Sequence, residues 1–163
     1  MKVFGVAGWK NTGKTGLVER LVAEFTARGL AVSTLKHAHH AARLDTPGSD
    51  TDRHGAAGAR EVMLATRRGW SLVRRTPEAE PEPALEDLLA RLAPADLILV
   101  EGWKAAPIPK LLCHRADVGT PPDTGLPGVR AVASDVPLAG LPVPVLPLDD
   151  TGAIAGLIAA AVR

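Results

Sequence analysis

The sequence predicts an α/β domain with three layers, in which helices flank a mostly parallel, mixed sheet. A β-prone run at 2–7 is followed, from Lys14, by apolar residues at helical spacing, and a second β-prone run covers 31–36. A strand, a helix and a strand in this order normally give parallel strands with a right-handed crossover. The run 96–101 is apolar almost throughout, which is typical of a strand buried on both faces of a sheet.

The segments between and after these runs complete the prediction. Residues 37–60 are polar and predict a long loop that leads into a short helix around 50–59. The remaining elements are expected as a hairpin of 61–66 with 71–76, an amphipathic helix at 84–92, strands at 110–115, 129–134 and 142–148, and a helix from Thr151. No repeat or long linker divides the chain, so we expect a single domain over residues 1–163.

Composition excludes several classes of protein. The chain has 163 residues, of which 46% are hydrophobic and 23% charged, so it is neither disordered nor fibrous. Only 3% of the residues are aromatic and the net charge is +1, which argues against nucleic-acid binding. Residues 1–75 nevertheless hold 13 Lys and Arg against 6 acids, a balance that suits a polyanion such as a nucleotide phosphate tail.

The single cysteine, Cys113, excludes an intramolecular disulfide and fits a reducing compartment. The apolar tracts are too short, or too often broken by proline, to span a bilayer, and the chain does not start like a signal peptide. We therefore expect a cytoplasmic protein with no membrane partner.

Residues 8–15 read GWKNTGKT, which matches the phosphate-binding loop G-x-x-x-x-G-K-[ST] at every fixed position. The motif lies between a predicted strand and a predicted helix, so backbone N–H groups and the helix N-terminus would converge on phosphates. Lys14 would reach the β- and γ-phosphates and Thr15 would bind Mg²⁺. This motif predicts a P-loop NTPase-type domain. The nucleotide-binding candidates in the loop are Gly8, Trp9, Lys10, Asn11, Thr12, Gly13, Lys14, Thr15 and Gly16.

A second candidate segment is DLILVEGWK at 96–104. The strand places the Glu101 carboxylate at its C-terminal end, where α/β sheets present ligands. Glu101 is expected to help hold Mg²⁺, Gly102 to offer its N–H to the γ-phosphate, and Lys104 to pair with an anion.

The segment 36–54 carries four histidines and three aspartates, and two tasks compete for it. It can act as a switch that brings Asp45 or Asp50 beside Mg²⁺ and the attacking water. Alternatively, its histidines bind a transition metal or contact an anionic partner with the help of Lys36 and Arg53. The histidines concerned are His37, His39, His40 and His54.

The predicted strand at 129–134 is followed by Asp135. A carboxylate at this position can accept hydrogen bonds from N1 and N2 of guanine, which adenine does not offer in that arrangement. A turn-capping role before Pro137 explains the same residue equally well.

GWKNTGKT, KHAHH, DTPGSDT, the following RH and AAGA, VEGWK and VRAVASD occur in this order over residues 8–135. Together they resemble the molybdopterin-guanine dinucleotide biosynthesis protein B family. The resemblance implies a dimeric GTP-binding adapter with weak Mg²⁺-dependent GTPase activity in molybdenum cofactor biosynthesis. Its implied partners are the molybdopterin guanylyltransferase and a molybdopterin-type ligand.

The resemblance also implies roles for individual residues. The loop residues, Glu101 and Gly102 would form the nucleotide site, and the histidine segment would face the cofactor or partner enzyme. Independently of the resemblance, the residues that we expect to act in hydrolysis are Lys14, Asp45 and Glu101. The wider class often carries a second lysine directly after the first loop glycine, which reaches the other subunit of a dimer. Trp9 occupies that position here.

Two other functions use the same features. A small-molecule kinase would transfer the γ-phosphoryl group from the same loop, with Arg67, Arg68, Arg74 and Arg75 as candidate lid residues. A nucleotide-dependent metallochaperone would instead use the histidines, and stoichiometric nickel or zinc binding would identify it.

Overall fold

A computed structural model of the chain describes residues 1–38, 43–77 and 79–162. The chain packs into two compact units, the first formed by residues 1–37 and 85–163 and the second by residues 38–84. The predicted single nucleotide-binding domain over 1–163 stays a prediction. In the part of the chain that is described, no helix is both long and apolar enough to cross a membrane.

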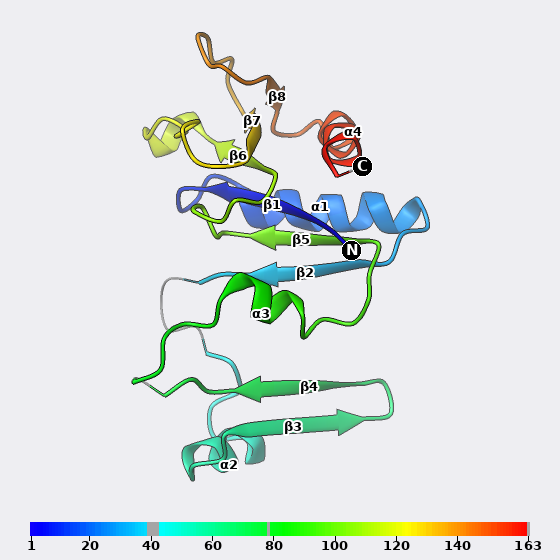
Figure 1. The fold of residues 1–163 in the computed structure, drawn as a ribbon, viewed down its shortest axis with the longest axis vertical. Coiled ribbons are helices and arrows are strands. Elements are labelled where there is room, and N and C mark those ends of the chain that lie inside the picture. The colour runs from blue at the N-terminus through cyan, green and yellow to red at the C-terminus, as the bar shows by residue number, and fades with distance from the viewer. Residues whose placement is uncertain (39–42, 78, 163) are drawn as a thin grey trace. The chain divides into compact units, whose positions relative to one another are not determined.

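The first unit is built on a six-stranded sheet in the order β2-β5-β1-β6-β7-β8, and every pair of neighbouring strands is parallel (Figure 1). The strands are β1 (Lys2–Gly8), β2 (Val32–Lys36), β5 (Leu97–Glu101), β6 (Lys110–His114), β7 (Val129–Ser134) and β8 (Val145–Pro147). The helices are α1 (Lys14–Ala27), α3 (Leu85–Leu89) and α4 (Thr151–Ala161), with a 3-10 turn at Ala116–Val118. The predicted α/β fold with a mostly parallel sheet is confirmed.

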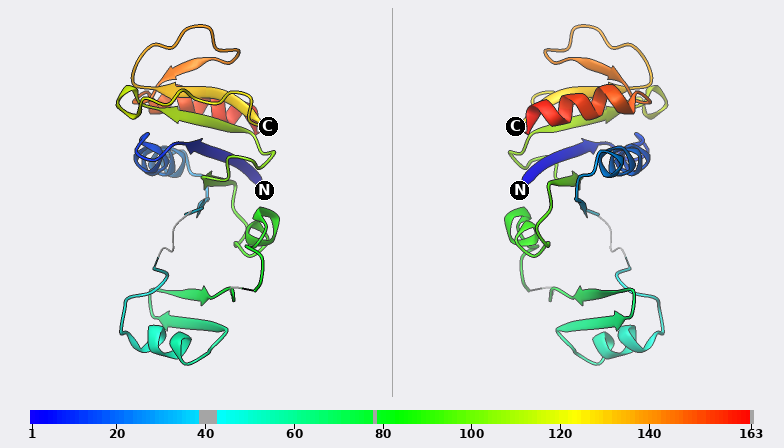
Figure 2. Two further views of the ribbon diagram at one scale, coloured as in Figure 1. Left: turned by 90° about the vertical axis from the view of Figure 1, so that its left-hand side faces the viewer. Right: turned by 90° about the vertical axis from the view of Figure 1, so that its right-hand side faces the viewer.

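Alternating side chains of the strands form separate cores on the two faces of this sheet. Phe4 and Val6 of β1 and Leu99 of β5 pack with the buried faces of α1 and α4, which contact each other (Figure 2). On the opposite face, Ile98 of β5 packs with Leu85 and other apolar residues of α3 and its surroundings. Because both faces are covered, β5 is buried along its whole length, as its continuous apolar sequence predicts.

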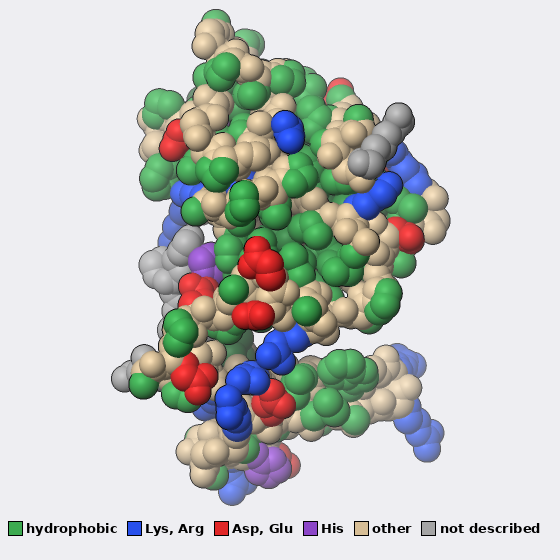
Figure 3. All heavy atoms as spheres, viewed as in Figure 1, with side chains coloured by type: hydrophobic (Ala, Val, Ile, Leu, Met, Phe, Trp, Pro, Cys, Tyr) green, Lys and Arg blue, Asp and Glu red, His purple; other side chains and the backbone are tan. Residues whose placement is uncertain are grey.

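The second unit contains α2 (Asp50–Ala56) and an antiparallel hairpin of β3 (Glu61–Thr66) and β4 (Gly69–Arg74). The hairpin forms where it is predicted, with a second strand that runs over Gly69–Arg74 instead of 71–76. Helix α2 is shorter than predicted because Gly55 lies in its last turn and Gly58, with a φ of 107°, follows it. Figure 3 shows hydrophobic side chains at the surface of the hairpin in this view.

Candidate functional site

The loop between β1 and α1 has the backbone conformation that its glycines predict. Gly8 has a φ of 144° and Gly13 a φ of 86°, values that L side chains rarely adopt. A Cβ atom at Gly8 would lie 2.5 Å from the carbonyl oxygen of Cys113, so only glycine fits there. Asn11 also has a positive φ, of 66°. The chain therefore turns tightly around the N-terminus of α1, which begins at Lys14.

Side chains of the loop converge on one backbone carbonyl. The carbonyl oxygen of Trp9 accepts a hydrogen bond from the buried Thr12 hydroxyl at 2.8 Å and another from the Lys14 ammonium. Partial burial lowers the pKa of Lys14 from its ordinary value. Lys14 thus lies folded over the loop, where its ammonium is available to an anion held by the loop backbone. The outer positions Lys10 and Gly16 are not buried, and an added Cβ at Gly16 would meet no close neighbour.

Thr15, Glu101 and Lys36 form a hydrogen-bonded cluster, a candidate cation site, at the C-terminal ends of β5 and β2. The Thr15 hydroxyl donates to Oε1 of Glu101 at 3.0 Å. The Lys36 ammonium lies 3.1 Å from that carboxylate oxygen and 3.1 Å from Oγ1 of Thr15. Glu101 is only 7% exposed, so its charge needs a counter-ion at this place.

These residues fit Mg²⁺. A carboxylate and a hydroxyl are the hard oxygen ligands that Mg²⁺ prefers, usually together with phosphate oxygens and water. The Lys36 ammonium already occupies a position between both oxygens, which marks the place as one that attracts a cation. Thr15 and Glu101, the predicted metal ligands, are therefore brought together.

Gly102 follows Glu101 with a φ of 97°, and its N–H donates to the carbonyl of Val6 at 3.0 Å. A Cβ at Gly102 would lie 2.9 Å from Cβ of His37, so the close passage of the two strand ends requires glycine. In this structure the N–H of Gly102 pairs with the carbonyl of Val6 in β1. Its contact with a γ-phosphate stays a prediction.

A groove of about 410 Å³ continues from the loop along the N-terminal part of α1. Arg20 and Arg115 line it together with Asn11, Gly13 and Lys14. Arg20 is held in place by hydrogen bonds to the carbonyl of Leu148 at 2.8 Å and to Oγ1 of Thr151 at 3.0 Å. Three cationic side chains along one groove suit a chain of phosphates.

Asp135 follows β7, and its Oδ1 accepts the backbone N–H of Ala116 at 3.0 Å. The neighbouring Ser134 hydroxyl lies 3.1 Å from Nδ1 of the buried His114. Asp135 therefore joins the segments that follow β6 and β7 at the carboxyl edge of the sheet, and its reading of guanine stays a prediction.

The acidic residues expected to act as a switch belong to the second unit. Oδ1 of Asp45 accepts the N–H of Thr46 at 2.7 Å, and hydrogen bonds led by that from Thr51 lower the pKa of Asp45. Ser49 caps α2 by accepting the N–H of Asp52, and Asp50 forms an ion pair with Arg53. The DTPGSDT motif thus stabilises the start of α2, while the proposed role of Asp45 in hydrolysis stays a prediction.

The histidine segment lies only partly in the described residues, since His39 and His40 fall outside them. The ring of His37 stacks on Trp103 at 4.4 Å between centroids, and His54 is exposed on α2. Among the described residues, no group of three or more His, Cys, Asp or Glu could hold a metal. Of the arginines considered for a lid, Arg74 pairs with Glu61 and Arg75 with Asp52, both within the second unit.

No sequence motif assigns Arg20 and Arg115 a role at this site, and none places Lys36 beside Glu101. The sequence does contain a signal for the pairing of Lys36 with Glu101, because the predicted strands 31–36 and 96–101 end in residues of opposite charge. Lys36 and Glu101 are register partners, yet this becomes evident only once β2 and β5 are known to be neighbours.

Comparison with known proteins identifies the family of this chain. Residues 3–135 match the family model of molybdopterin guanine dinucleotide synthesis protein B, MobB. The chain belongs to the MobB family. The resemblance found in the sequence motifs is thereby confirmed.

Two curated relatives of this MobB chain are named molybdopterin-guanine dinucleotide biosynthesis adapter protein. The one from Haemophilus influenzae is 39% identical over 139 residues, covering 83% of this chain and 76% of its own. The one from Escherichia coli is 38% identical over 160 residues, covering 96% and 90%. A crystal structure of a MobB homologue from Bacillus stearothermophilus matches with a TM-score of 0.71 at 30% identity, over 100% of this chain and 99% of that one.

Proposed function

We propose that this MobB-family protein is an adapter of molybdopterin guanine dinucleotide synthesis whose first unit binds GTP together with Mg²⁺. The observation that carries the nucleotide part is the cation site of Thr15, Glu101 and Lys36 beside a phosphate-binding loop of matching sequence and backbone. The curated relatives carry the adapter role in their names. A molybdopterin-type ligand and the guanylyltransferase are the partners that this function requires, and we place the protein in the cytoplasm.

Each part of the site has a task in this proposal. The loop N–H groups and Lys14 hold the β- and γ-phosphates, and Arg20 and Arg115 extend the positive charge along the groove. Thr15 and Glu101 hold Mg²⁺, which neutralises charge on the phosphate oxygens when it is bound. Asp135 reads the guanine edge, as an acceptor for the N–H groups that adenine lacks.

We infer that hydrolysis is slow. The sequence contains no glutamine, so a water-orienting glutamine of the type used by many GTPases is missing. Arg20, the arginine on α1, is engaged by Leu148 and Thr151. Lys14 and Arg115 remain as cations of the groove, and we propose that full stabilisation of the transition state also needs groups that a partner brings.

The alternative of a small-molecule kinase has weaker support. Arg74 and Arg75, its candidate lid residues, are engaged in ion pairs with Glu61 and Asp52. A metallochaperone would rely on histidines, of which the described His37 is stacked on Trp103 and His54 is exposed on α2. Neither arrangement favours these functions over GTP binding.

Replacement of Lys14 tests the nucleotide site directly. Lys14→Ala removes the charged donor to the phosphates. GTP affinity is expected to fall about 100-fold or more, which is the effect of losing a charge-assisted hydrogen bond that is shielded from water. Lys2→Ala, at the opposite end of β1, is the control and should bind GTP like the unchanged protein. Binding is measured by calorimetry, with circular dichroism as the check on folding. Equal GTP affinity of Lys14→Ala and Lys2→Ala would contradict the assignment.

A further inference from the structure

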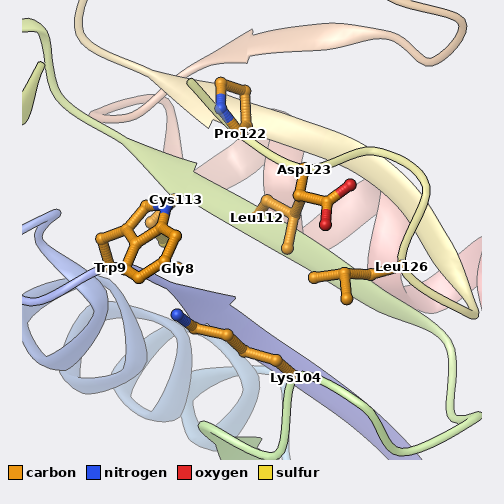
Figure 4. Close-up of a pocket in the computed structure, with 8 residues that line it drawn as sticks. All are labelled: Gly8, Trp9, Lys104, Leu112, Cys113, Pro122, Asp123 and Leu126. Carbon is orange, nitrogen blue, oxygen red and sulfur yellow. The ribbon is translucent and has the colours of Figure 1, made fainter. Parts of the chain in front are cut away.

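A second pocket lies beside the phosphate-binding loop, and its lining residues differ entirely from those of the groove along α1. It has a volume of about 140 Å³ and uses Gly8 and Trp9 of the loop (Figure 4). Leu112 and Leu126 supply apolar lining, and these two side chains belong to the core on the sheet face that carries Ala7 and Val132, away from α1 and α4. The loop therefore separates a cationic groove from a mainly apolar pocket.

The indole of Trp9 forms one wall of this pocket. Trp9 is 47% exposed, and the Lys104 ammonium lies 3.7 Å from the centroid of its ring (Figure 4). A cation over the ring indicates a π-face turned toward the pocket rather than buried in the core. A flat heterocycle can replace the ammonium on that face, and Lys104 would then meet an anionic substituent of the same ligand.

Asp123 contributes a carboxylate to the pocket, and Figure 4 shows it on the side where Leu126 lies. Its Oδ1 accepts the N–H of Gly125 at 3.1 Å, which fixes the side chain within its loop. A carboxylate has two oxygens and about four acceptor positions, so this bond leaves acceptor capacity for a ligand. Two adjacent N–H donors on the edge of a heterocycle match such a group.

The walls of the pocket are fixed before any ligand arrives. Lys110 is fully buried, and its ammonium donates to the carbonyls of Lys104 at 2.8 Å and Pro127 at 2.7 Å, and also to that of Ala106. One charged group thereby ties the segment that carries Lys104 to the loop that carries Asp123 and Leu126. Binding sites for small molecules are usually preformed in this way.

The size and chemistry of the pocket select the ligand. Complete ligand pockets measure about 300–1,000 Å³, so a space of this size takes one ring system and leaves the rest of the ligand outside. An aromatic wall, apolar lining, a carboxylate and a lysine suit a flat ring with a 2-amino-4-oxopyrimidine edge and an anionic tail. Pterins and guanine share this edge, and the groove along α1 already offers the nucleotide a place.

We propose that this pocket binds the pterin ring of a molybdopterin-type ligand, stacked on Trp9, with Asp123 accepting from the ring edge and Lys104 pairing with the anionic substituent. The inference deepens the proposed function and rests on it for the identity of the ligand. On this account one loop holds the two halves of the future dinucleotide on its two sides.

Pterin-6-carboxylic acid is a stable fluorescent probe for this site, and its anisotropy reports binding to the full chain. Saturable 1:1 binding is expected, with affinity reduced about tenfold or more by Trp9→Ala and by Asp123→Asn. Trp9→Phe keeps a stacking surface and should restore most of the affinity. Asp117→Asn, an exposed acid on the neighbouring 3-10 turn, is the matched control and should bind like the unchanged protein.

Lys14→Ala separates this proposal from the nucleotide site, since it should lose GTP and keep the pterin. Saturating GTP should likewise leave pterin binding in place. The pterin proposal is overturned if no saturable binding occurs, or if Trp9→Ala and Asp123→Asn bind the probe like Asp117→Asn. It is also overturned if GTP or Lys14→Ala abolishes pterin binding, or if guanosine binds through Trp9 and Asp123 and the pterin does not.

Discussion

A buried carboxylate needs a cation, and at Glu101 the Lys36 ammonium meets this requirement in a place that we propose for Mg²⁺. Glu101 has only 10% of its side chain exposed, whereas its partner Lys36 is 56% exposed at the side chain. The ammonium can therefore move into solvent when Mg²⁺ arrives with a nucleotide. Lys36 is the last residue of β2.

Lys36→Met tests this exchange. The substitution leaves the Glu101 carboxylate without its ammonium, so the ligand-free protein should lose about 1–2 kcal/mol of stability, less than for a fully buried pair because Lys36 is half exposed. Mg²⁺ should then raise the melting temperature of Lys36→Met more than that of the unchanged protein. Lys10→Met, an exposed lysine with no carboxylate contact, serves as the comparison for stability. A melting temperature of Lys36→Met that equals that of Lys10→Met, with and without Mg²⁺, would refute the exchange.

A fixed spacing lets the sequence predict the backbone of individual residues. The positive φ angles of Gly8 and Gly13 follow from the loop pattern, while the roles of Lys14 and Thr15 toward phosphate and Mg²⁺ stay predictions. Lys36 cannot be placed beside Glu101 in this way, because their pairing depends on strand order, which no local pattern encodes. For Asp45 the sequence pattern is ambiguous. The residue suggests a switch, but in the structure it accepts hydrogen bonds from Thr46 and Ser49 that stabilise the start of α2.

At the scale of elements, the start of α2 depends on ionised aspartates. The N–H of Gly48 and the guanidinium of Arg75 hold the pKa of Asp52 below its ordinary value of 3.8. Hydrogen bonds from Thr51 and Thr46 act in the same direction on the pKa of Asp45. A carboxyl whose folded pKa is depressed contributes stability above its unfolded pKa and loses it as the pH falls through the folded value.

We therefore expect the second unit to lose stability selectively below about pH 4. Asp52→Asn should reproduce part of this loss at pH 7 and show a smaller further change on acidification. Hydrogen exchange of residues 43–77, corrected for the intrinsic effect of pH, measures both. Asp50→Asn, on the same helix, is the control. Protection of the second unit that is unchanged from pH 7 to pH 3 would disprove the role of these carboxylates.

The β3–β4 hairpin has an apolar face suited to a second copy of the chain. Met63 is the register partner of Leu72, and Ala65 that of Trp70, so these side chains share one face. Met63 is 60% and Trp70 69% exposed. A face of this kind usually marks an interface, and the homodimer that the family resemblance implies would bury it.

Trp70→Glu places a charge in the centre of that face and should shift the protein from dimer to monomer at micromolar concentration. Ser71→Glu adds the same charge on the opposite face of the hairpin and should leave the dimer intact. Sedimentation velocity distinguishes the two states. A monomeric unchanged protein, or a Trp70→Glu variant that dimerises as well as Ser71→Glu, would rule out this interface.

The spacing of apolar residues predicts most helices and strands, because an element that is buried on one face, or on both, has apolar residues at regular intervals or in a continuous run. Strand β5 and helix α1 follow directly from theirs, and so does the hairpin, whose two runs are separated by a short polar turn. The end of α2 and the short length of α3 escape prediction, since local breakers and packing decide where a short helix stops. Strand order follows from the packing of the cores and not from any single segment.

For the whole molecule, parallel topology explains why the candidate site lies where it does. The carboxyl ends of β1, β2, β5, β6 and β7 meet at one edge of the sheet, so residues far apart in sequence gather there. Thr15, Lys36 and Glu101 are examples, and Asp135 follows the end of β7 at the same edge. The sequence could predict that such an edge exists, whereas the second pocket depends on two loops tied by Lys110, which has no sequence signature.

Calorimetric titration with GTP and with ATP, each with and without Mg²⁺, tests the central claim most directly. The account predicts Mg²⁺-dependent 1:1 binding of GTP that exceeds binding of ATP. In Asp135→Asn the preference for guanine should shrink, since the amide offers one acceptor oxygen where the carboxylate offers two. Equal or tighter binding of ATP, or binding of GTP that ignores Mg²⁺, would contradict the account.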